Sequence, residues 1–403
     1  MKNLIERKKY TSQIGTFQDK PIIKVLTGQR RVGKSYIVKS IIDNLRRRGV
    51  NAKNIIYINK EELKFDFIKD YRDLAGYIEK ESSSSVKSKK IYLFIDEVQE
   101  IAKFEKAVRS FAVRDRFDIY ITGSNSKIIS SELATFLSGR YIEIPVFPLD
   151  YSEFLLFSGL SNEQASLQKY LKYGGMPFIH RSELTDEMVY TYTKNIYNTI
   201  LLKDVVEKFD IRNVQFMEKL VAFLCENIGY IFSANSISDY LKSEKLKIAP
   251  SVIIDYLEAI RSSYLIHEAK RYDLKGKKIF KINSKFYIND IGIRNAISGY
   301  AESSAGQLVE NAVFSHLLSN GYRVHVGVLG DKEVDFVALK GEKTVYIQVA
   351  LTVGNKETRA REFSNLTLLE DNYEKIVVSL DPMVRDYKGI KHFRLDDFFI
   401  NFK

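Results

Sequence analysis

The sequence has 403 residues, which is longer than a usual single domain and predicts two or three domains. With 45% hydrophobic and 28% charged residues it has the composition of a soluble globular protein, and its formal net charge of +11 permits nucleic-acid binding without establishing it. The single cysteine excludes an internal disulfide, and no uncharged apolar run is long enough to span a bilayer.

The beginning of the chain and the cysteine usage indicate where the protein is found. Residues 1–9 lack the apolar core of a secretory signal. Cys225 lies in an apolar helical run and is expected to be a buried packing thiol. A cytoplasmic protein without a membrane partner is therefore expected, and the five histidines have no spacing that supports a structural zinc site.

Residues 28–35 match the phosphate-binding pattern G-x-x-x-x-G-K-[ST]. An apolar run at 22–27 predicts a strand before the loop, and residues 36–45 predict a helix after it, which is the context that the motif requires. Backbone N–H groups and the helix N-terminus would bind a triphosphate, Lys34 would reach its β- and γ-phosphates, and Ser35 would ligate Mg²⁺. The alternative is an ordinary strand-to-helix turn. The predicted nucleotide contacts are Gly28, Gln29, Arg30, Arg31, Val32, Gly33, Lys34, Ser35 and Tyr36.

A second stretch, residues 91–97, is a hydrophobic strand that ends in two carboxylates. Asp96 would hold the same Mg²⁺, directly or through water, and Glu97 would polarise an attacking water. Taken alone, two acids at a strand end could equally be an ordinary solvated strand end. Because the same chain also carries a phosphate loop, a chance occurrence of both motifs is a poor explanation. Gln99 is a plausible polar neighbour of the acids, although a solvated loop amide is the simpler interpretation.

Apolar runs at 22–27, 54–58, 91–96, 118–122 and 141–146 alternate with helical segments and predict a parallel sheet covered by helices. The fourth run ends in Ile-Thr-Gly-Ser-Asn-Ser at 121–126, and here the sequence resembles the AAA+ ATPases. In that family a polar residue at this strand tip senses the γ-phosphate, and Asn125 or the neighbouring Ser124 matches it.

Residues 136–149 resemble one prokaryotic branch of that family, whose AAA domain is joined to a C-terminal domain of unknown function numbered 4143. The sequences of the phosphate loop and of the acidic strand fit the same branch. The resemblance makes Arg140 a candidate arginine finger, with a structural ion pair to Glu143 as an equal alternative. A finger that acts on a neighbouring subunit would require a homo-oligomer.

After the predicted ATPase core at 1–149, residues 150–213 have a helical pattern that Gly174-Gly175-Met176-Pro177 interrupts. The resemblance implies a helical lid over the nucleotide. Residues 214–295 predict three helices and then a hairpin with a basic tip, which resembles a winged helix. DNA contact through Lys275, Lys277 and Lys278 competes with a protein-packing role, because Asp255 and Glu258 on the third helix would repel phosphates.

Residues 296–403 resemble the PD-(D/E)xK nuclease core, in which acids and a lysine bind metal and activate water. The resemblance carries over to Asp335 and, in a preceding helix, to Glu310. It fails on the next strand, where Gln348 replaces a carboxylate and Ala350 replaces the lysine. We therefore expect a nuclease-like domain that does not cut.

Together these features predict an α/β protein with an AAA+ P-loop core, a helical lid, a winged-helix-like domain and a degenerate nuclease-like domain. The expected activity is hydrolysis of ATP with Mg²⁺, coupled to binding of double-stranded DNA or of a protein partner. Two alternatives stay open: an ATP-gated protein scaffold and an ATP-regulated DNA nuclease.

Overall fold

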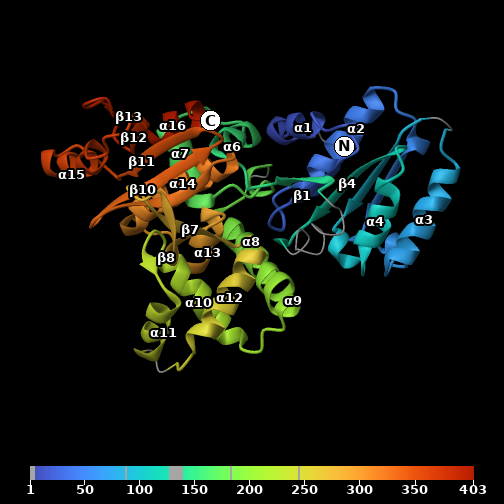
Figure 1. Cartoon of the computed structure of the whole chain (residues 1–403), viewed down its shortest axis with the longest axis horizontal. Coiled ribbons are helices and arrows are strands. Elements are labelled where there is room, and N and C mark those ends of the chain that lie inside the picture. The colour runs from blue at the N-terminus through green and yellow to red at the C-terminus, as the bar shows by residue number, and fades with distance from the viewer. Residues whose placement is uncertain (1–4, 87–88, 127–138, 182–183, 244–245) are drawn as a thin grey trace. The chain divides into compact units, whose positions relative to one another are not determined.

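The computed structural model describes residues 5–86, 89–126, 139–181, 184–243 and 246–403 (Figure 1). The chain forms two compact units. The first contains residues 1–147 and 262–264, and the second contains residues 148–261 and 265–403. Each unit is described by itself.

The first unit is built on a five-stranded sheet in which every pair of neighbours is parallel. The strand order is β2-β3-β4-β1-β5. All five predicted strands are present within a residue or two of the expected bounds, so the prediction of a parallel α/β core is confirmed. The strands are β1 (Ile23–Thr27), β2 (Ile55–Asn59), β3 (Ile91–Asp96), β4 (Phe117–Gly123) and β5 (Tyr141–Pro145).

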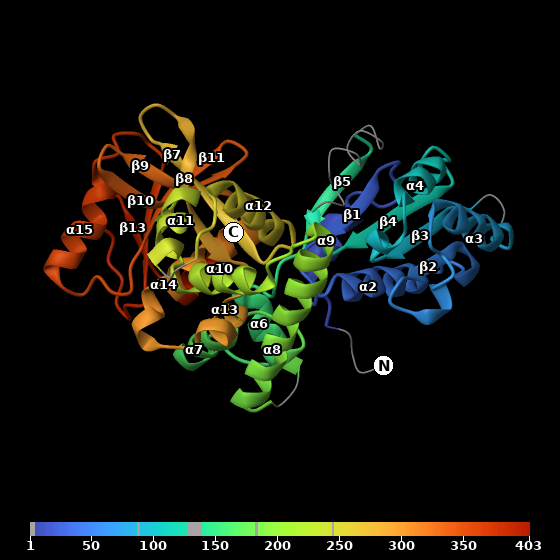
Figure 2. The same cartoon turned by 90° about the horizontal axis from the view of Figure 1, so that it is seen from below.

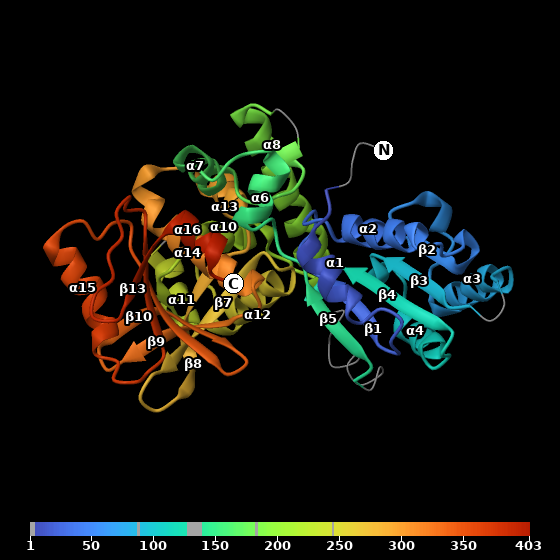
Figure 3. The same cartoon turned by 90° about the horizontal axis from the view of Figure 1, so that it is seen from above.

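Helices cover both faces of this sheet (Figures 2 and 3). On one face lies α2 (Lys34–Arg47), which also packs on α1 (Lys8–Gly15). On the other face lie α3 (Tyr71–Ser83) and α4 (Phe104–Ala112), and alternate strand residues form a buried core with them. Short 3₁₀ turns complete the connections at Ala52–Asn54, Leu63–Phe65 and Val98–Glu100.

The second unit begins with the predicted helical segment. Asp150 caps the first helix, because its side chain accepts from the Glu153 N–H while the Glu153 side chain accepts from the Asp150 N–H. The elements are α6 (Tyr151–Ser158), α7 (Gln164–Tyr173), a 3₁₀ turn (Ile179–Arg181), α8 (Asp186–Thr199), a π-helical turn (Ile200–Val206) and α9 (Glu207–Phe209).

Residues 214–298 supply further helices and a hairpin in the predicted order. These elements are α10 (Val214–Glu226), β6 (Ile231–Phe232), α11 (Ala234–Ser243), α12 (Pro250–Ser262), β7 (Ile266–Asp273), β8 (Lys278–Ile288) and α13 (Ile291–Ser298). The hairpin does not form a separate sheet, because β7 also pairs in parallel with β9 of the following segment. A separate winged helix therefore stays a prediction, and in this unit the hairpin shares one sheet with the C-terminal strands.

That sheet has eight strands in the order β13-β12-β11-β10-β9-β7-β8-β6. Strand β9 was not predicted, and it extends the expected β10–β11 hairpin to an antiparallel meander. Helix α15 packs on β10, β11 and β12, whereas α14 contacts β8 and β9. The C-terminal elements are α14 (Ala305–Ser319), β9 (Arg323–Leu329), β10 (Lys332–Lys340), β11 (Lys343–Val349), α15 (Lys356–Thr367), β12 (Glu374–Ser379), β13 (Lys391–Arg394) and α16 (Leu395–Asn401).

The Gly174-Gly175 turn is fixed by Asp290, which lies just before α13. The Asp290 carboxylate accepts hydrogen bonds from the Gly175 N–H at 2.7 Å and from the Ile293 N–H at 3.0 Å. A Cβ on Gly174 would lie 2.5 Å from the Asp290 carboxylate, and a Cβ on Gly292 would lie 2.1 Å from the Tyr173 carbonyl oxygen. The turn that interrupts the helical pattern is thus a close-packed joint between α7 and α13.

This joint predicts a specific pH dependence of stability. Burial raises the pKa of the Asp290 carboxyl to about 6, against the opposing effect of its backbone hydrogen bonds. Because the folded chain holds this proton more tightly than the unfolded chain, the free energy of unfolding should fall as the pH rises from about 4 to about 6. Measured as melting temperature against pH, that fall should be smaller in Asp290→Asn. The exposed control Asp255→Asn should follow wild type, and identical pH profiles for all three proteins would contradict the assignment.

Candidate nucleotide-binding site

The predicted phosphate loop connects β1 to α2 and has an unusual backbone. Gly28, Arg31 and Gly33 have φ values of 142°, 67° and 100°, so three of six consecutive residues have positive φ. A Cβ on Gly28 would lie 2.2 Å from the Val146 carbonyl oxygen, a contact that no side chain can make. Glycine is required at this position because the loop passes directly against the segment that follows β5.

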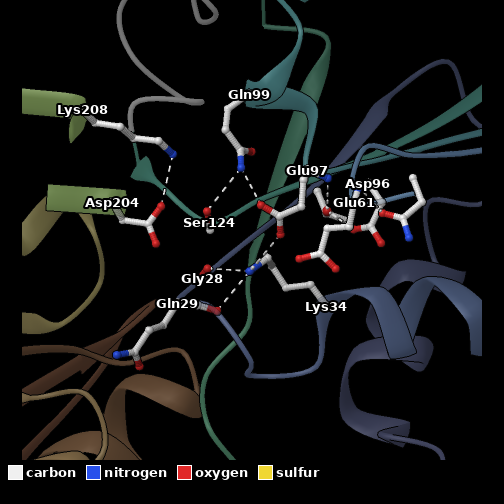
Figure 4. A network of polar contacts seen from close by, with 12 residues as sticks. Gly28, Gln29, Lys34, Glu61, Asp96, Glu97, Gln99, Ser124, Asp204 and Lys208 are labelled. Carbon is white, nitrogen blue, oxygen red and sulfur yellow. Dashed lines mark hydrogen bonds and ion pairs between the residues drawn. The ribbon is translucent and has the colours of Figure 1, made fainter. Parts of the chain in front are cut away.

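The loop leads into the N-terminus of α2, where Gly33 caps the helix without a side-chain hydrogen bond. The first amide groups of a helix carry partial positive charge and bind anions. Lys34 follows at once, and its Nζ donates to the carbonyl oxygens of Gly28 at 2.8 Å and Gln29 at 3.0 Å (Figure 4). The ammonium is therefore placed over the loop, as a phosphate-binding lysine must be.

The two acids lie at the carboxyl end of β3, beside the end of β4. Asp96 is 1% exposed and accepts hydrogen bonds from the Thr122 hydroxyl and, at 3.1 Å, from the Tyr57 hydroxyl. The Glu97 backbone N–H donates to the same Thr122 hydroxyl at 3.1 Å. One threonine thus fixes the side chain of one acid and the backbone of the next.

Tyr57 and Thr122 were missed as site residues in the sequence. Thr122 lies near the carboxyl end of β4 and Tyr57 in the middle of the short strand β2, and the carboxyl ends of parallel strands meet at one edge of a sheet. That placement was the available signal. Burial, followed by the charge of Asp96, raises the pKa of the Tyr57 hydroxyl, which therefore stays protonated and continues to donate.

Glu97 faces Lys34, with 3.9 Å between Oε1 and Nζ. Burial opposes ionisation of the Glu97 carboxyl, but the positive charge of Lys34 and the Gln99 amide hold its pKa below the ordinary value. The Gln99 Nε2 donates to Glu97 and, at 3.3 Å, to the Ser124 hydroxyl (Figure 4). The expectation of a solvated Gln99 amide is wrong, because the hydrogen bonds to Glu97 and Ser124 hold this side chain in the site.

Ser124 and Asn125 follow β4 at the same edge of the sheet, and they are 0% and 2% exposed. Their position agrees with a polar sensor at this strand tip, and both residues remain candidates for it. Tyr36, in the first turn of α2, is 55% exposed, so its ring is available for contact with a ligand.

Arg140 is not brought to this site. It lies just before β5, is exposed, and accepts from the Ile23 N–H at 2.9 Å through its carbonyl oxygen. Ile23 begins β1 and the phosphate loop follows Thr27 at the other end of that strand, so Arg140 lies at the opposite edge of the sheet. Arg140 therefore lies at the end of the sheet away from the phosphate loop of its own chain.

The Glu143 carboxylate accepts from the Thr27 hydroxyl at 2.7 Å. Of the stretch that carried the resemblance, residues 136–138 lie outside the described residues.

The donor set fits Mg²⁺ bound together with a nucleotide. Each Asp96 oxygen accepts one hydrogen bond and keeps a lone pair, and the Ser35 hydroxyl lies in the first turn of α2. Within the described residues no three His, Cys, Asp or Glu side chains cluster as a metal site. Mg²⁺ characteristically takes one or two protein ligands and completes its shell with phosphates and water.

The other predicted residues lie in the second unit. Lys275, Lys277 and Lys278 are exposed at the β7–β8 turn. Glu310 and Asp335 converge on Lys285, a residue that the sequence did not single out, and the Gln348 Oε1 accepts from the Asp335 N–H at 3.4 Å. None of the helices in the described ranges is both long and apolar enough to cross a bilayer.

Comparison with known proteins locates two families along the chain. Residues 20–155 match the family described as AAA domain, and residues 164–304 match a domain of unknown function, DUF8612. These matches do not support the predicted branch with domain 4143. A Haemophilus influenzae protein described as uncharacterized is 35% identical over 382 residues, which cover 94% of each chain.

Two more distant proteins are also similar. A Methanocaldococcus jannaschii protein described as uncharacterized is 31% identical over 395 residues, covering 88% of this chain and 84% of that protein. The Walker-type ATPase of Pyrococcus abyssi is similar in structure over 73% of this chain and 96% of its own, with 14% identity and a TM-score of 0.49.

The geometry predicts that Lys34→Ala loses ATP binding. Charge-assisted hydrogen bonds contribute roughly 1.5–3 kcal/mol each, so losing the two that Lys34 would make to the β- and γ-phosphates should lower the affinity, measured by calorimetry with Mg²⁺, by at least about 100-fold. Lys39→Ala, an exposed change on the same helix, should bind as wild type does. Unchanged affinity in Lys34→Ala would show that the loop does not bind the phosphates.

Proposed function

This chain belongs to the protein family of its Haemophilus influenzae and Methanocaldococcus jannaschii relatives and carries an AAA domain with a P-loop, and from this premise we propose that it is an ATPase. It binds ATP together with Mg²⁺ and hydrolyses it to ADP and phosphate. The observation that supports this most strongly is the Thr122 hydroxyl, which joins Asp96 and Glu97 beside the Lys34 ammonium.

The residues divide the chemistry between them. The loop amides and Lys34 bind the phosphates and neutralise charge that develops on them in the transition state. Ser35 and Asp96 hold Mg²⁺, which supplies Lewis-acid stabilisation of the phosphoryl oxygens when it is bound. Thr122 and Tyr57 keep the Asp96 carboxylate in one orientation, so no rearrangement is needed at the moment of reaction.

Glu97 is the residue that orients and polarises the attacking water. A carboxylate can accept a proton only when it is ionised, and Lys34 and Gln99 favour that form here. Gln99 acts through Glu97: its amide holds the carboxylate and connects it to Ser124 at the tip of β4. Asn125 follows Ser124 in the chain. Through the Gln99 hydrogen bonds, the presence of a γ-phosphate at the tip of β4 would affect the position of the Glu97 carboxylate.

Arg140 would act only on the nucleotide of a second copy of the chain. Its exposed position at the far edge of the sheet suits a surface that meets another subunit. A homo-oligomer is therefore part of the proposal, and Arg140 would stabilise transition-state charge across the subunit boundary.

If Glu97 polarises the attacking water, replacing it should impair ATP hydrolysis without impairing ATP binding. Glu97→Gln keeps the shape and the Gln99 contact but cannot accept the proton, so ATP should still bind while steady-state hydrolysis falls by about 10²–10⁴-fold. The matched control is Glu100→Gln, three residues along the chain and exposed, which should hydrolyse ATP at the wild-type rate. Equal turnover by wild type and Glu97→Gln would remove Glu97 from this role.

The second unit is proposed to receive the nucleotide signal and to contact double-stranded DNA with its hairpin. The support is the exposed group Lys275, Lys277 and Lys278, whose turn is closed by a hydrogen bond from the Lys275 N–H to Asp273 at 3.0 Å. Helix α12 does not add to this surface. Its Arg261 is paired with Glu258 at 3.2 Å and with Glu268 at 3.0 Å.

A protein partner is the second candidate, and the exposed face of α12 favours it. This face carries Ile254, which is 57% exposed, beside the acidic Asp255 and Glu258. Apolar and acidic side chains together suit a protein surface better than a phosphate backbone.

Salt dependence distinguishes the two candidates. Replacing Lys275, Lys277 and Lys278 by Gln should weaken duplex binding and make the slope of log affinity against log salt shallower by roughly 3, since each lost phosphate contact removes about 0.9. The same change at the exposed Lys169, Lys203 and Lys388 removes equal charge elsewhere and should leave the slope unchanged. Negligible wild-type affinity at low salt, or equal slopes in all three proteins, would favour the protein partner.

A further inference from the structure

A buried lysine occupies the centre of the acidic group in the second unit. The Lys285 side chain is 4% exposed, and its Nζ lies 2.7 Å from Glu333, 3.1 Å from Glu310 and 3.8 Å from Asp335. A lysine buried to this extent is stable only when it is paired. Three carboxylates surround this one.

The four charged residues come from three separate elements. Lys285 is on β8, where it lies between Ile231 of β6 and Ala269 of β7. Glu310 is on α14, and Glu333 and Asp335 are on β10. The ion pairs therefore join the hairpin to both the helix and the strands of the C-terminal segment.

A β-bulge aims the Asp335 side chain. The register between β10 and β9 shifts between Val334 and Val337, and both valines belong to the core under α15. Phe336 instead packs near Phe314 of α14, with 5.9 Å between ring centroids. The extra residue lets Asp335 point toward Lys285 while its neighbour still fills the core.

Glu310 is held by several groups of the second unit. Its carboxylate accepts from the Tyr287 hydroxyl at 2.7 Å as well as from Lys285 at 3.1 Å. A Cβ on Gly229 would lie 2.9 Å from the other Glu310 oxygen, so that glycine leaves room for the carboxylate. One Glu310 oxygen thus accepts two hydrogen bonds, and the other lies beside Gly229.

The protonation of the group follows from its surroundings. Burial and the charge of Glu310 raise the pKa of Asp335 to about 8, although Lys285 acts in the opposite direction. Burial opposes the charge on Lys285, but Glu310, Asp335 and Glu333 raise its pKa above the ordinary value. Lys285 therefore carries its positive charge at neutral pH.

These residues do not fit the divalent metal that a nuclease-like domain requires. Gln348 supplies a neutral amide that is engaged with the Asp335 N–H and, at 3.0 Å, with Glu362, and Ala350 supplies no cation. The ammonium of Lys285 lies where a metal would have to be coordinated by Glu310 and Asp335. A second positive charge at this position would be repelled.

We propose that Lys285 is the permanent internal cation of this acidic group, that it replaces a divalent metal, and that it fixes the β7–β8 hairpin to the C-terminal strands. The group is then a structural ion-pair centre and not a nuclease site.

The proposal is tested by binding of Mn²⁺ to the full chain without nucleotide, measured by electron paramagnetic resonance. All proteins carry Asp96→Asn, which removes the metal ligand of the first unit. The parent protein should bind no Mn²⁺ that depends on Glu310. Lys285→Met frees the carboxylates, so it should gain one Mn²⁺ per chain, and adding Glu310→Gln should abolish that gain.

The same variants test the structural role. Loss of one partner of a buried ion pair is strongly destabilising, so Lys285→Met should melt roughly 10 °C below its parent, whereas Lys278→Met, on the exposed part of the same strand, should not. Lys285→Arg keeps the charge and should stay folded without binding Mn²⁺, which gives a reading even if Lys285→Met does not fold.

Three results would overturn the proposal. One is Mn²⁺ binding by the parent protein that Glu310→Gln removes. Another is a Lys285→Met protein that gains no Mn²⁺ and melts with its parent. The third is plasmid nicking with Mn²⁺ that Asp335→Ala abolishes, because the group would then be a working metal site with Lys285 as part of it.

Discussion

The hydrogen bonds of Thr122 are the interaction on which the candidate site depends. In the parallel pair of β3 and β4, Ile95 lies opposite Ile121, so the next residues lie side by side: Asp96 at the end of β3 and Thr122 one residue before the end of β4. The threonine hydroxyl then donates to the Asp96 carboxylate and accepts from the Glu97 N–H. Strand register therefore sets the orientation of the candidate metal ligand Asp96 and of the proposed water-polarising residue Glu97, because both lie at the end of β3, whose residues form part of the buried core.

The same edge of the sheet also places the phosphate loop. Because β1 is adjacent to β4 and parallel to it, the loop after Thr27 emerges beside Ser124 and Asn125. The Lys34 ammonium can therefore approach Glu97, which comes from a different strand. The same strand geometry places Arg140 away from the phosphate loop. Arg140 precedes the parallel strand β5 and therefore lies at the edge of the sheet where the strands begin.

Much of this arrangement could be predicted from the sequence, and the limits have physical causes. The loop motif and the acidic strand are local patterns, and five apolar runs were enough to predict the parallel sheet. Thr122 and Lys285 were missed because their roles depend on partners far along the chain, Asp96 in one case and Glu310 in the other. In the sequence Lys285 is one more basic residue of the hairpin, and sequence alone does not distinguish a buried lysine from an exposed one. Gln99 was misjudged because the tight turn after Glu97, where φ is 56°, brings its amide back toward the carboxylate.

The buried lysines Lys34 and Lys285 show that the same side chain can bind a ligand in one environment and prevent ligand binding in another. The Lys34 ammonium donates to the backbone carbonyls of Gly28 and Gln29, and the Glu97 carboxylate lies 3.9 Å from it. Neutral carbonyls neutralise less of its charge than carboxylates would, so a polyanion that replaced them would gain electrostatic attraction to the ammonium. Lys285 is surrounded by three acidic side chains, which match its charge inside the fold. An incoming anion would meet a net negative group there, and an incoming cation would have to displace the ammonium first. The charge around each lysine, more than the burial they share, therefore decides that the first can bind nucleotide while the second can only hold the fold together.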